Sequence, residues 1–372
     1  MKVLVLGGLG RIGSKAIEYI SFLDQVDEVI IADNDLREAE KIKAGINLKI
    51  KLVYLHIQEE HQRLLQLIEE VEMVLNLAGP AYKFGSQVAK AAVDAGVSYY
   101  LDICNDYEVM KEIFSIEDRA RERGVVILAG MGWSPGLTNL AVKKGCKDFS
   151  KIERVQISLC TSAADEKGFA AIAHILKSLQ RRPIYIKEGK VVEVEREELD
   201  KEVVVNFPEP LGRNRVVDYV HPEPFTLARY IPDIQELNVR GGMKPTWVHK
   251  VTKGMIRCPL FKREKYLEGL ASLIYRYQVL FPRGTVPFSS FRVDIEGSIE
   301  NERVHKVLMM LNRKKSIVGI TLATALVMLK EKPDIFPGVY APEGCLNPDV
   351  FFARLRDSGL ELIEKNRGDN DN

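Results

Sequence analysis

Short, almost wholly apolar runs recur through the first third of the chain, and polar residues separate them. Each run is apolar at consecutive positions, which is typical of strands buried on both faces of a parallel sheet. The runs are Val3–Leu6, Val29–Ala32, Leu52–Leu55, Met73–Leu77, Tyr99–Leu101 and Val125–Leu128. They predict a sheet that is covered by helices on both sides.

Between these runs, apolar residues stand three and four positions apart, as they do on the buried face of an α-helix. The stripes are Ile12, Ala16 and Ile20; Leu64, Leu67, Ile68 and Val71; and Val88, Ala91, Ala92 and Ala95. Strands that alternate with helices along a chain form parallel sheets with right-handed crossovers. The pattern therefore predicts a doubly wound α/β domain, which we assign to residues 1–148.

After Gly130 the alternation gives way to longer strands joined by tight turns. The expected strands are Val155–Thr161, Ile184–Lys187, Val191–Val194, Ile234–Val239, Phe291–Ile299 and Val304–Asn312. Strands joined by hairpins pair antiparallel, so this part of the chain predicts a mixed or antiparallel sheet. Helices at Ala164–Gln180 and Lys265–Leu280 are expected to cover one face of that sheet. We assign residues 149–315 to this second, α+β domain.

The remaining segment, residues 316–372, carries two further helical patterns, at Gly319–Leu329 and Asp349–Leu355. We expect both helices to pack back on the first domain. The polar tail Asn366–Asn372 is expected to fray, as chain ends without docking contacts do.

The composition narrows the class of protein. The chain has 372 residues, 46% of them hydrophobic, and its 53 basic and 52 acidic residues give a net charge of +1. This composition excludes a disordered protein. The balanced charge argues against nucleic acid as a partner and against a polybasic membrane anchor. No run of about 18 uncharged apolar residues occurs, so we expect no transmembrane helix. Met1–Leu6 runs directly into a glycine-rich turn, without the apolar core and cleavage site of a signal peptide, so we expect no signal peptide either.

The cysteines argue against a disulfide framework and against a thiolate metal site. Their number is odd, and no two form a C-x-x-C pair. They are Cys104, Cys146, Cys160, Cys258 and Cys345. Free thiols suit a reducing compartment, so we expect a cytoplasmic protein without a structural metal.

A glycine-rich turn between the first strand and the first helix predicts a dinucleotide site. Gly8-Leu9-Gly10-Arg11-Ile12-Gly13 has the pattern G-x-G-x-x-G, and Asp33 ends the second strand about 20 residues later. In such a turn Gly8 permits the bend, Gly10 lets the backbone approach a pyrophosphate, and Gly13 lets the helix pack closely on the strand. The positive end of the helix then faces the phosphates.

The acid after the second strand favours NAD over NADP, because a carboxylate accepts hydrogen bonds from the ribose hydroxyls and repels a 2′-phosphate. Two alternatives stay open. Arg11 and Arg37 lie near enough in sequence to meet a 2′-phosphate, and Asp33 could instead cap the turn before Leu36. The predicted cofactor-binding residues are Gly8, Gly10, Arg11, Ile12, Gly13, Asp33, Ala78, Gly79 and Pro80.

Ligands of an open α/β sheet lie beyond the carboxyl ends of its strands. The segments that follow the fourth, fifth and sixth strands are Asn76–Tyr82, Asp102–Asn105 and Gly130–Gly136. Asp102 ends an apolar strand, so it should be partly desolvated and able to bind an ammonium group or act as a base.

Each of these side chains also has a structural alternative. Asp102 and Asn105 could cap the helix that begins near Asp106. Tyr82 and Trp133 could be core aromatics with a bonded polar tip. We interpret Cys104 as a small buried hydrophobic residue.

These motifs, in this order, resemble the saccharopine dehydrogenase-like oxidoreductases. The resemblance begins with Gly8–Gly13 and continues through nearly the whole chain. Its other segments are Leu75–Pro80, Ala91–Val97, Tyr99–Asp102, Gly130–Leu137, His221–Tyr230, Arg240–Gly242 and Gly338–Glu343. The nearest members are the lysine 6-dehydrogenases and the short saccharopine reductases. The family's fold is a Rossmann domain interrupted by a mixed-sheet substrate domain.

The resemblance implies oxidation at a carbon that bears an amine, or the reverse reductive amination, with L-lysine 6-dehydrogenase as the leading form. Reductive condensation of an amine with an oxo compound, of the saccharopine or carboxyspermidine type, is an alternative. A non-catalytic NAD(P)-binding sensor is another. The stretch Met243–Lys262 is basic, carries no acid and does not match a family pattern, so it leaves the substrate open.

The chemistry predicts a proton acceptor for the amine and a cation for an amino-acid carboxylate. The catalytic candidates are Asp102, Tyr82 and His221. Arg213, Arg229 and Arg240 are candidates for the carboxylate, because arginine binds that group in a bidentate manner. Asn105, Trp133, Pro135 and Gly136 complete the predicted substrate-binding set. The ribbons of the second domain could form a two-fold interface, so we expect a homodimer.

Overall fold

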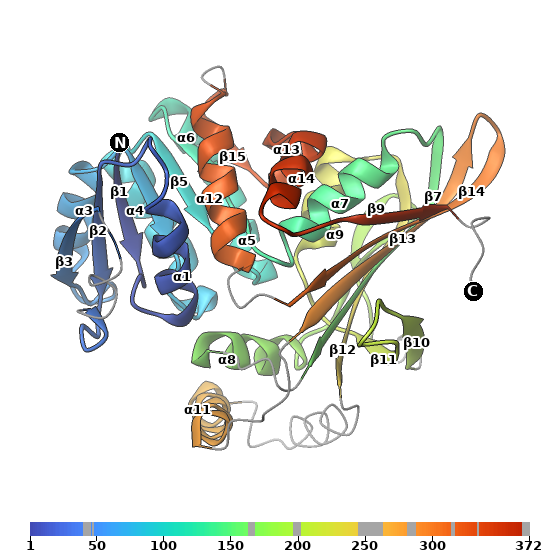
Figure 1. The fold of residues 1–372 in the computed structure, drawn as a ribbon, viewed down its shortest axis with the longest axis horizontal. Coiled ribbons are helices and arrows are strands. Elements are labelled where there is room, and N and C mark those ends of the chain that lie inside the picture. The colour runs from blue at the N-terminus through green and yellow to red at the C-terminus, as the bar shows by residue number, and fades with distance from the viewer. Residues whose placement is uncertain are drawn as a thin grey trace. The chain divides into compact units, whose positions relative to one another are not determined.

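The computed structural model of the chain describes residues 1–39, 46, 48–162, 168–195, 202–244, 263–280, 288–313, 317–332 and 335–366. Two compact units make up the chain (Figure 1). The first contains Met1–Leu137 and Ser316–Asn347, and the second contains Thr138–Lys315 and Pro348–Asn372.

A seven-stranded parallel sheet forms the centre of the first unit, with strand order β15-β6-β5-β4-β1-β2-β3. This confirms the predicted doubly wound sheet. The strands are β1 (Lys2–Leu6), β2 (Glu28–Asp33), β3 (Lys49–Tyr54), β4 (Met73–Asn76), β5 (Tyr99–Asp102), β6 (Val126–Leu128) and β15 (Gly338–Tyr340). β15 was not predicted, because three residues carry no periodicity. It adds to β6 at the edge of the sheet.

Two groups of helices cover this sheet. Helices α3 (His61–Glu69), α4 (Ala81–Ala95) and α5 (Tyr107–Phe114) lie in a row with α4 in the middle. Helix α12 (Ile317–Lys330), from the C-terminal part of the chain, packs on α1 (Arg11–Ile20) (Figure 1). Right-handed crossovers that run in opposite directions place α1 and α3 on opposite faces. Two shorter helices, α6 (Glu117–Glu122) and α13 (Pro342–Cys345), also belong to the described part of the unit.

The contact between α12 and α1 depends on Gly319. A Cβ at this position would lie 2.9 Å from the backbone carbonyl of Lys15, so only glycine permits this spacing. Most of α12 is apolar and buried, which explains why it closes the first unit although residues 138–315 of the second unit lie between it and β6 in the sequence. The segment Gly319–Leu329 therefore belongs to the first unit, as expected, because its apolar side chains are buried there against α1.

The second unit is built on a nine-stranded mixed sheet, as predicted. Its main path is β10-β11-β12-β7-β13-β14-β16, and β8 and β9 branch from β12. β7 (Lys151–Ser162) pairs parallel with β12 (Ile234–Lys244), and the other pairs are antiparallel. The remaining strands are β8 (Ile184–Lys187), β9 (Lys190–Glu193), β10 (Val203–Asn206), β11 (Arg213–Asp218), β13 (Ser289–Ile299), β14 (Glu302–Asn312) and β16 (Ile363–Asn366).

Five helices accompany the second sheet among the described residues. They are α7 (Leu137–Cys146), α8 (Phe169–Ser178), α9 (Glu223–Tyr230), α11 (Glu264–Leu280) and α14 (Pro348–Asp357). The first residues of the predicted helix Ala164–Gln180 lie outside the described residues. Helices α8 and α11 lie side by side, and α7 approaches β13 and β14 at Gly145.

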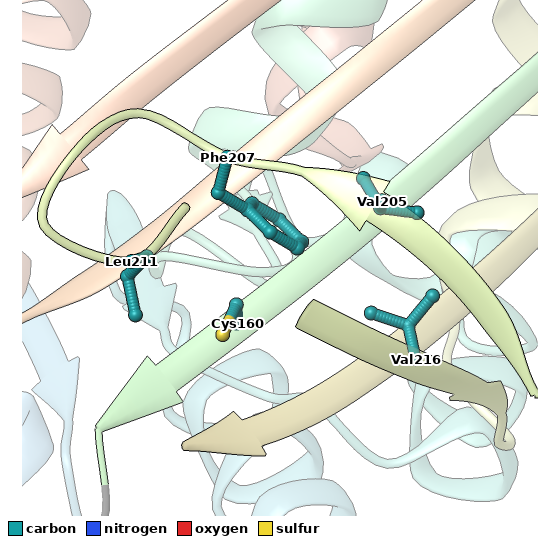
Figure 2. Close-up of a cluster of buried hydrophobic side chains, with 5 residues drawn as sticks. All are labelled: Cys160, Val205, Phe207, Leu211 and Val216. Carbon is teal, nitrogen blue, oxygen red and sulfur yellow. The ribbon is translucent and has the colours of Figure 1, made fainter. Parts of the chain in front are cut away.

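The loop between β10 and β11 folds over β7 and buries Cys160 (Figure 2). Val205, Phe207, Leu211 and Val216 surround this thiol, and Asn214 donates a hydrogen bond to Sγ at 2.7 Å. The described cysteines Cys104, Cys146, Cys160 and Cys345 are all buried free thiols. Cys160 therefore serves as a core residue.

The units divide at different residues from those we expected. The first division falls after Leu137 instead of after residue 148, and Pro348–Asn372 belongs to the second unit instead of packing on the first. Ion pairs explain the second difference: Lys144 of α7 binds Asp349 of α14 at 2.6 Å and Glu364 of β16 at 3.2 Å. β16 also pairs with β14 as far as Asn366, and residues 367–372 of the predicted polar tail lie outside the described residues.

Gly319→Ala is expected to lower the free energy of unfolding by about 1–3 kcal/mol, since the added methyl group meets backbone atoms of α1. Gly269→Ala is the control, because its Cβ would meet nothing within 4 Å in the interior of α11. That change should stabilise by about 0.5–1 kcal/mol, the usual gain from alanine in a helix. Urea unfolding of the full chain measures both, and equal effects would contradict the close contact.

Candidate functional site

The turn between β1 and α1 bends at Gly7, one residue before the predicted motif. Gly7 has φ +71°, and a Cβ there would lie 2.7 Å from the amide nitrogen of Ala78. Gly8 has another role than expected, because the left-handed bend falls on Gly7. A Cβ on Gly8 would lie 2.7 Å from Ile31 Cγ2, so this glycine allows the turn to pack on β2.

Gly13 lets α1 pack closely on the turn, as expected. Its Cβ would lie 2.6 Å from the Cα of Gly8, a separation that no side chain tolerates. Gly10 precedes the helix as its N-cap, with extended backbone (φ −67°, ψ 170°), and it is exposed. Among the residues predicted to follow it, Arg11 is exposed and Ile12 is half-buried.

The start of α1 fits a pyrophosphate. No side chain caps this helix, and its first turn carries no acid. The amide groups of the first turn and the positive end of the helix dipole are therefore available to an anion. A bound dinucleotide would be held by the backbone of Gly8–Gly13, close to the exposed Gly10 and Gly79.

Asp33, at the end of β2, is bound to this turn. Its carboxylate accepts hydrogen bonds from the amide of Leu9 at 3.0 Å and from the amide of Asp35 at 3.2 Å. Partial burial raises the pKa of Asp33, and the two amide groups oppose that rise. Asp33 therefore does cap the turn that follows β2. Its hydrogen bond with Leu9 also holds the carboxylate beside the glycine turn.

Arg37, the side chain that could have met a 2′-phosphate, is bound elsewhere. Its Nε donates to Asp35 Oδ1 at 2.8 Å, and its Nη2 contacts Asp35 Oδ2. This guanidinium lowers the pKa of Asp35 to about 2. The charge of Arg37 is consequently compensated within its own loop.

The segment after β4 returns toward the same turn. Asn76 accepts a hydrogen bond from the amide of Ala78 at 3.2 Å, and Gly79 and Pro80 follow with a cis peptide bond. Gly79 is exposed, Ala78 is half-buried and Pro80 is buried. Tyr82 lies in the first turn of α4 and is half-buried.

Asp102 is fully enclosed at the carboxyl end of β5. Its Oδ1 accepts from the amides of Cys104 (2.9 Å) and Gly130 (2.8 Å), and its Oδ2 accepts from the hydroxyl of Tyr100 at 3.0 Å. Tyr100 in turn accepts from the amide group of Asn76 at 3.0 Å. Burial raises the pKa of Asp102, and the three donors oppose that rise.

This geometry gives Asp102 a structural role. Its carboxylate ties together the segments that follow β5 and β6, and through Tyr100 the end of β4. The side chain is only 2% exposed, so it does not present a base to solvent. Asp102 does not cap the next helix either. That cap is Asp106, whose side chain accepts hydrogen bonds from the amides of Glu108 and Val109. The neighbouring Asn105 is half-buried.

Cys104 is buried beside Asp102, as expected for a small apolar residue. Burial raises the pKa of its thiol well above the usual value, and the nearby carboxylate of Asp102 adds to the effect. Burial and the neighbouring carboxylate therefore disfavour a thiolate at this position.

The turn after β6 is compact. Gly130 and Gly136 have φ +78° and +121°, and the amide of Gly132 donates to the carbonyl of Pro135 at 3.0 Å. Pro135 and Gly136 are buried, whereas Trp133 is half-buried. Of the predicted substrate-binding residues in this turn, only Trp133 thus offers side-chain surface.

A second polar centre lies in the second unit, between β11 and α9. The Nδ1 of His221 is hydrogen-bonded to Oε2 of Glu223, and Oε1 of Glu223 accepts from Thr138 Oγ1 at 2.9 Å. Asn139 donates to Thr226 Oγ1 at 2.9 Å in the same cluster. Sequence reasoning selected His221 and missed Glu223, although both belong to the motif His221–Tyr230.

The three predicted arginines lie on three different elements, β11, α9 and β12. Arg240 is buried on β12, and its Nε binds Oδ1 of Asp218 at 3.0 Å across the strand pair. This ion pair compensates the charge of Arg240, so it is not a ready carboxylate site. Arg213 and Arg229 are exposed, at the start of β11 and in the last turn of α9.

Two classes of site receive no support from the described part of the chain. It contains no group of three or more histidine, cysteine or acidic residues that could hold a metal ion. It also contains no helix with the length and apolar character needed to cross a membrane.

Comparison with known proteins defines the class of the first domain. The family model described as saccharopine dehydrogenase NADP binding domain matches residues 3–128, which include the glycine turn, Asp33 and Asp102. These residues form an NAD(P)-binding domain of the saccharopine dehydrogenase type. The resemblance seen in the motifs is thereby confirmed for residues 3–128.

Two known proteins are similar in sequence to parts of this chain, and the chain spans less than two thirds of the length of each. The chain is 27% identical over 158 residues to the lipid droplet localized protein of Caenorhabditis elegans. It is 23% identical over 248 residues to carboxyaminopropylagmatine dehydrogenase of Synechocystis sp.. The matches cover 40% and 63% of this chain and 36% and 60% of those two proteins.

The fold is that of saccharopine dehydrogenase (L-Glu forming) from Saccharomyces cerevisiae. The two structures agree with a TM-score of 0.71 at 15% identity, over 98% of this chain and 99% of the yeast chain. The likeness therefore extends to both units.

Gly10→Glu is expected to lower the affinity for NADH at least about tenfold, because the new carboxylate would face the pyrophosphate. The exposed position and ordinary backbone of Gly10 should preserve the fold. Gly168→Glu is the control, since Gly168 is likewise the N-cap of a ten-residue helix with extended backbone. NADH fluorescence titration of both variants measures the effect, and equal affinities would place the pyrophosphate elsewhere.

Asp33→Asn is expected to weaken NAD binding about tenfold and to strengthen NADP binding, because the carboxylate no longer repels the 2′-phosphate. Arg37→Ala is the control within the same loop, and it should leave both affinities within about twofold because Arg37 is paired with Asp35. Titrations with NADH and NADPH test this. A loss of NADPH affinity in Arg37→Ala would reverse the assignment.

Proposed function

We propose that the protein is an NAD(P)-dependent oxidoreductase that acts on the carbon–nitrogen group of an amino acid or amine. The observation that carries the proposal is the uncapped start of α1 at the exposed Gly10, inside a domain of the saccharopine dehydrogenase type. The names of the yeast and Synechocystis proteins, both dehydrogenases, support it.

NAD is the proposed cofactor, with NADP as the alternative. Asp33 is held beside the glycine turn by the amide of Leu9, where a ribose hydroxyl can donate to it. Arg37 is paired with Asp35 and so is not poised for a 2′-phosphate. Arg11, on the exposed start of α1, remains the residue that could favour NADP.

In the oxidative direction, one ammonium compound, NAD⁺ and water give a carbonyl compound, ammonium, NADH and one proton. The bound dinucleotide supplies the acceptor for the hydride. The protein must hold the amine-bearing carbon, take one proton from the ammonium group so that its lone pair is free, and admit water to the resulting imine. L-Lysine, oxidised at its terminal amine, is our first candidate substrate.

Reductive condensation of an amine with an oxo compound is the second candidate. The names saccharopine dehydrogenase and carboxyaminopropylagmatine dehydrogenase favour it. The same residues serve both directions, since the carbon–nitrogen double bond is common to them. A nucleotide-binding sensor without turnover is the third candidate.

We assign roles within this proposal as follows. Asp102 is a positioning residue, because its carboxylate holds the strand ends. His221 is the proposed proton acceptor, and Tyr82 stays an alternative. Substrate contacts are proposed for Asn105 and Trp133, which are half-buried, and for the exposed Arg213 and Arg229.

Two further properties of the whole protein belong to the proposal, its compartment and its oligomeric state. The buried free thiols of the described cysteines suit the cytoplasm. The long strands of the second unit provide a surface on which two copies could pair as a homodimer. Light scattering at micromolar concentration measures the second property directly.

The wild-type protein is expected to produce absorbance at 340 nm from lysine and NAD⁺, with a lower rate for NADP⁺. The assay runs over a panel of amines and amino acids, with Gly10→Glu as the inactive variant and Gly168→Glu as the active control. Turnover only in the reverse direction, with 2-oxo acids and NADH, would select reductive condensation. Tight NADH binding without turnover in either direction would select the sensor.

A further inference from the structure

Two polar side chains end neighbouring strands in the interior of the first unit. Asn76 is the last residue of β4 and Asp102 is the last residue of β5, and the register of this parallel pair places them opposite each other. They are 3% and 2% exposed. Burial of an amide or a carboxylate is unfavourable unless its polar atoms find partners, so the partners of Asn76 show what its side chain holds in place.

The hydroxyl of Tyr100 lies between these two side chains. It is 3.0 Å from Asp102 Oδ2 and 3.0 Å from Asn76 Nδ2, whereas the carbonyl of Gly85 is farther away at 3.5 Å. Burial and the neighbouring carboxylate raise the pKa of Tyr100 well above its ordinary value, so the phenol keeps its single proton. A charged acceptor at the shorter distance binds that proton most strongly. Tyr100 therefore donates to Asp102 and accepts from Asn76.

This order of donors and acceptors fixes the side-chain amide of Asn76. Because Nδ2 points to Tyr100, Oδ1 points to the segment that follows β4, where it accepts a hydrogen bond from the amide of Ala78 at 3.2 Å. The preceding amide, that of Leu77, still donates to the carbonyl of Leu6 on β1 at 2.9 Å. The chain thus leaves the sheet at Ala78, and a side chain holds its backbone there.

The backbone of this segment lies directly against the glycine turn. A Cβ on Gly7 would lie 2.7 Å from the amide nitrogen and 2.8 Å from the Cα of Ala78. Gly7 is itself tied to β2, because its amide donates to the carbonyl of Ala32 at 2.9 Å. A shift of Ala78 would therefore change its contact with the turn that begins the proposed pyrophosphate site.

We infer that the side chain of Asn76 positions the segment Ala78–Pro80 for the dinucleotide, and that the hydroxyl of Tyr100 acts on this segment through Asn76. The inference rests on the nucleotide-binding part of the proposed function and adds a residue that does not have to touch the cofactor. Asn76 is accordingly a positioning residue. All the groups that carry the argument belong to the first unit.

A segment that is held in place before the ligand arrives does not have to be ordered on binding, so the bonds that hold it contribute to affinity. Tyr100→Phe removes the acceptor that orients Asn76 and keeps the ring. We expect this variant to raise the Kd of NADH about three- to tenfold, the range that one ordinary hydrogen bond supplies. NADH fluorescence titration of the full chain measures the change.

Tyr99→Phe is the matched control, since it makes the same chemical change one residue earlier on β5. Successive side chains of a strand point to opposite faces, so Tyr99 lies on the other face of the sheet. There its ring lies 5.4 Å from Nζ of Lys330. This variant should keep the Kd of NADH within about twofold of the wild type.

A double-mutant cycle tests whether Tyr100 acts through Asn76. Asn76→Ala should raise the Kd of NADH at least as much as Tyr100→Phe does. In the Asn76→Ala background, Tyr100→Phe should change Kd by less than about 1.5-fold, because the group through which it acts is missing. A hydroxyl with a merely structural role would lower the unfolding midpoint and leave the NADH affinity of the folded protein unchanged.

Hydrogen exchange measured by NMR provides a readout without nucleotide. The amide proton of Ala78 should exchange at least about tenfold faster in Tyr100→Phe and in Asn76→Ala than in the wild type. The amide of Leu77, which is bonded to the sheet, should keep its rate.

Asn76→Ser is the conservative variant, and it also serves if Asn76→Ala does not fold. A serine hydroxyl accepts a hydrogen bond from the amide two residues on, though more weakly than asparagine. It should therefore restore part of the protection of Ala78 and part of the NADH affinity.

The outcomes separate the inference from the proposed function. Tyr100→Phe and Asn76→Ala variants that bind NADH as tightly as the wild type overturn the inference, and so do additive effects of the two changes. A wild type that binds NADH without turnover rejects the proposed oxidoreductase, and the affinities of the variants then still decide the inference. A wild type that binds neither NADH nor NADPH rejects both.

Discussion

The nucleotide half of the molecule depends on one close contact between backbones. α1 can pack against the turn after β1 only because Gly13 lacks a Cβ. This packing fixes the position of the N-terminus of α1, at Gly10. A second glycine, Gly319, allows α12 to pack equally closely on the backbone of α1 at Lys15 and Ala16. The proposed pyrophosphate site is therefore a consequence of helix packing and of the absence of side chains, and the helix dipole would attract the anion without a charged side chain.

Two buried carboxylates organise the functional segments by the same physical rule. A carboxylate can be buried only where hydrogen-bond donors surround it. The groups that donate to each of these two acids are therefore held in fixed positions. Asp102 accepts hydrogen bonds from the backbone amides of Cys104 and Gly130. Glu223 is instead hydrogen-bonded to the ring nitrogen of His221 and to the hydroxyl of Thr138. The difference in donors separates their roles. Amides around Asp102 set backbone geometry, whereas Glu223 fixes the imidazole of His221 and the hydroxyl of Thr138.

Sequence patterns predicted the repeated elements well and the roles of single polar residues poorly. Apolar runs and three-to-four spacing located most strands and helices, because burial imposes those periods directly. The short β15, the pairing of β16 with β14 and the division at Leu137 left no periodic signal. Arg240 was expected to meet a substrate and instead pairs with Asp218, since a cross-strand partner cannot be read from residues 22 positions apart. His221 was selected through its motif, but its carboxylate partner was not.

The sequence by itself determined the local geometry of this protein: the glycine turn, the acid after the second strand, the alternation of strand and helix, and the hairpins of the second sheet. Each of these follows from steric freedom or burial within a few residues. Tertiary structure alone decided which polar groups meet. Thr138 and Glu223 lie 85 positions apart, and Lys144 and Asp349 lie 205 apart, yet each pair is in contact. Such contacts depend on the path of the whole chain, because a hydrogen bond requires two groups to be close in space, whatever their separation in the sequence.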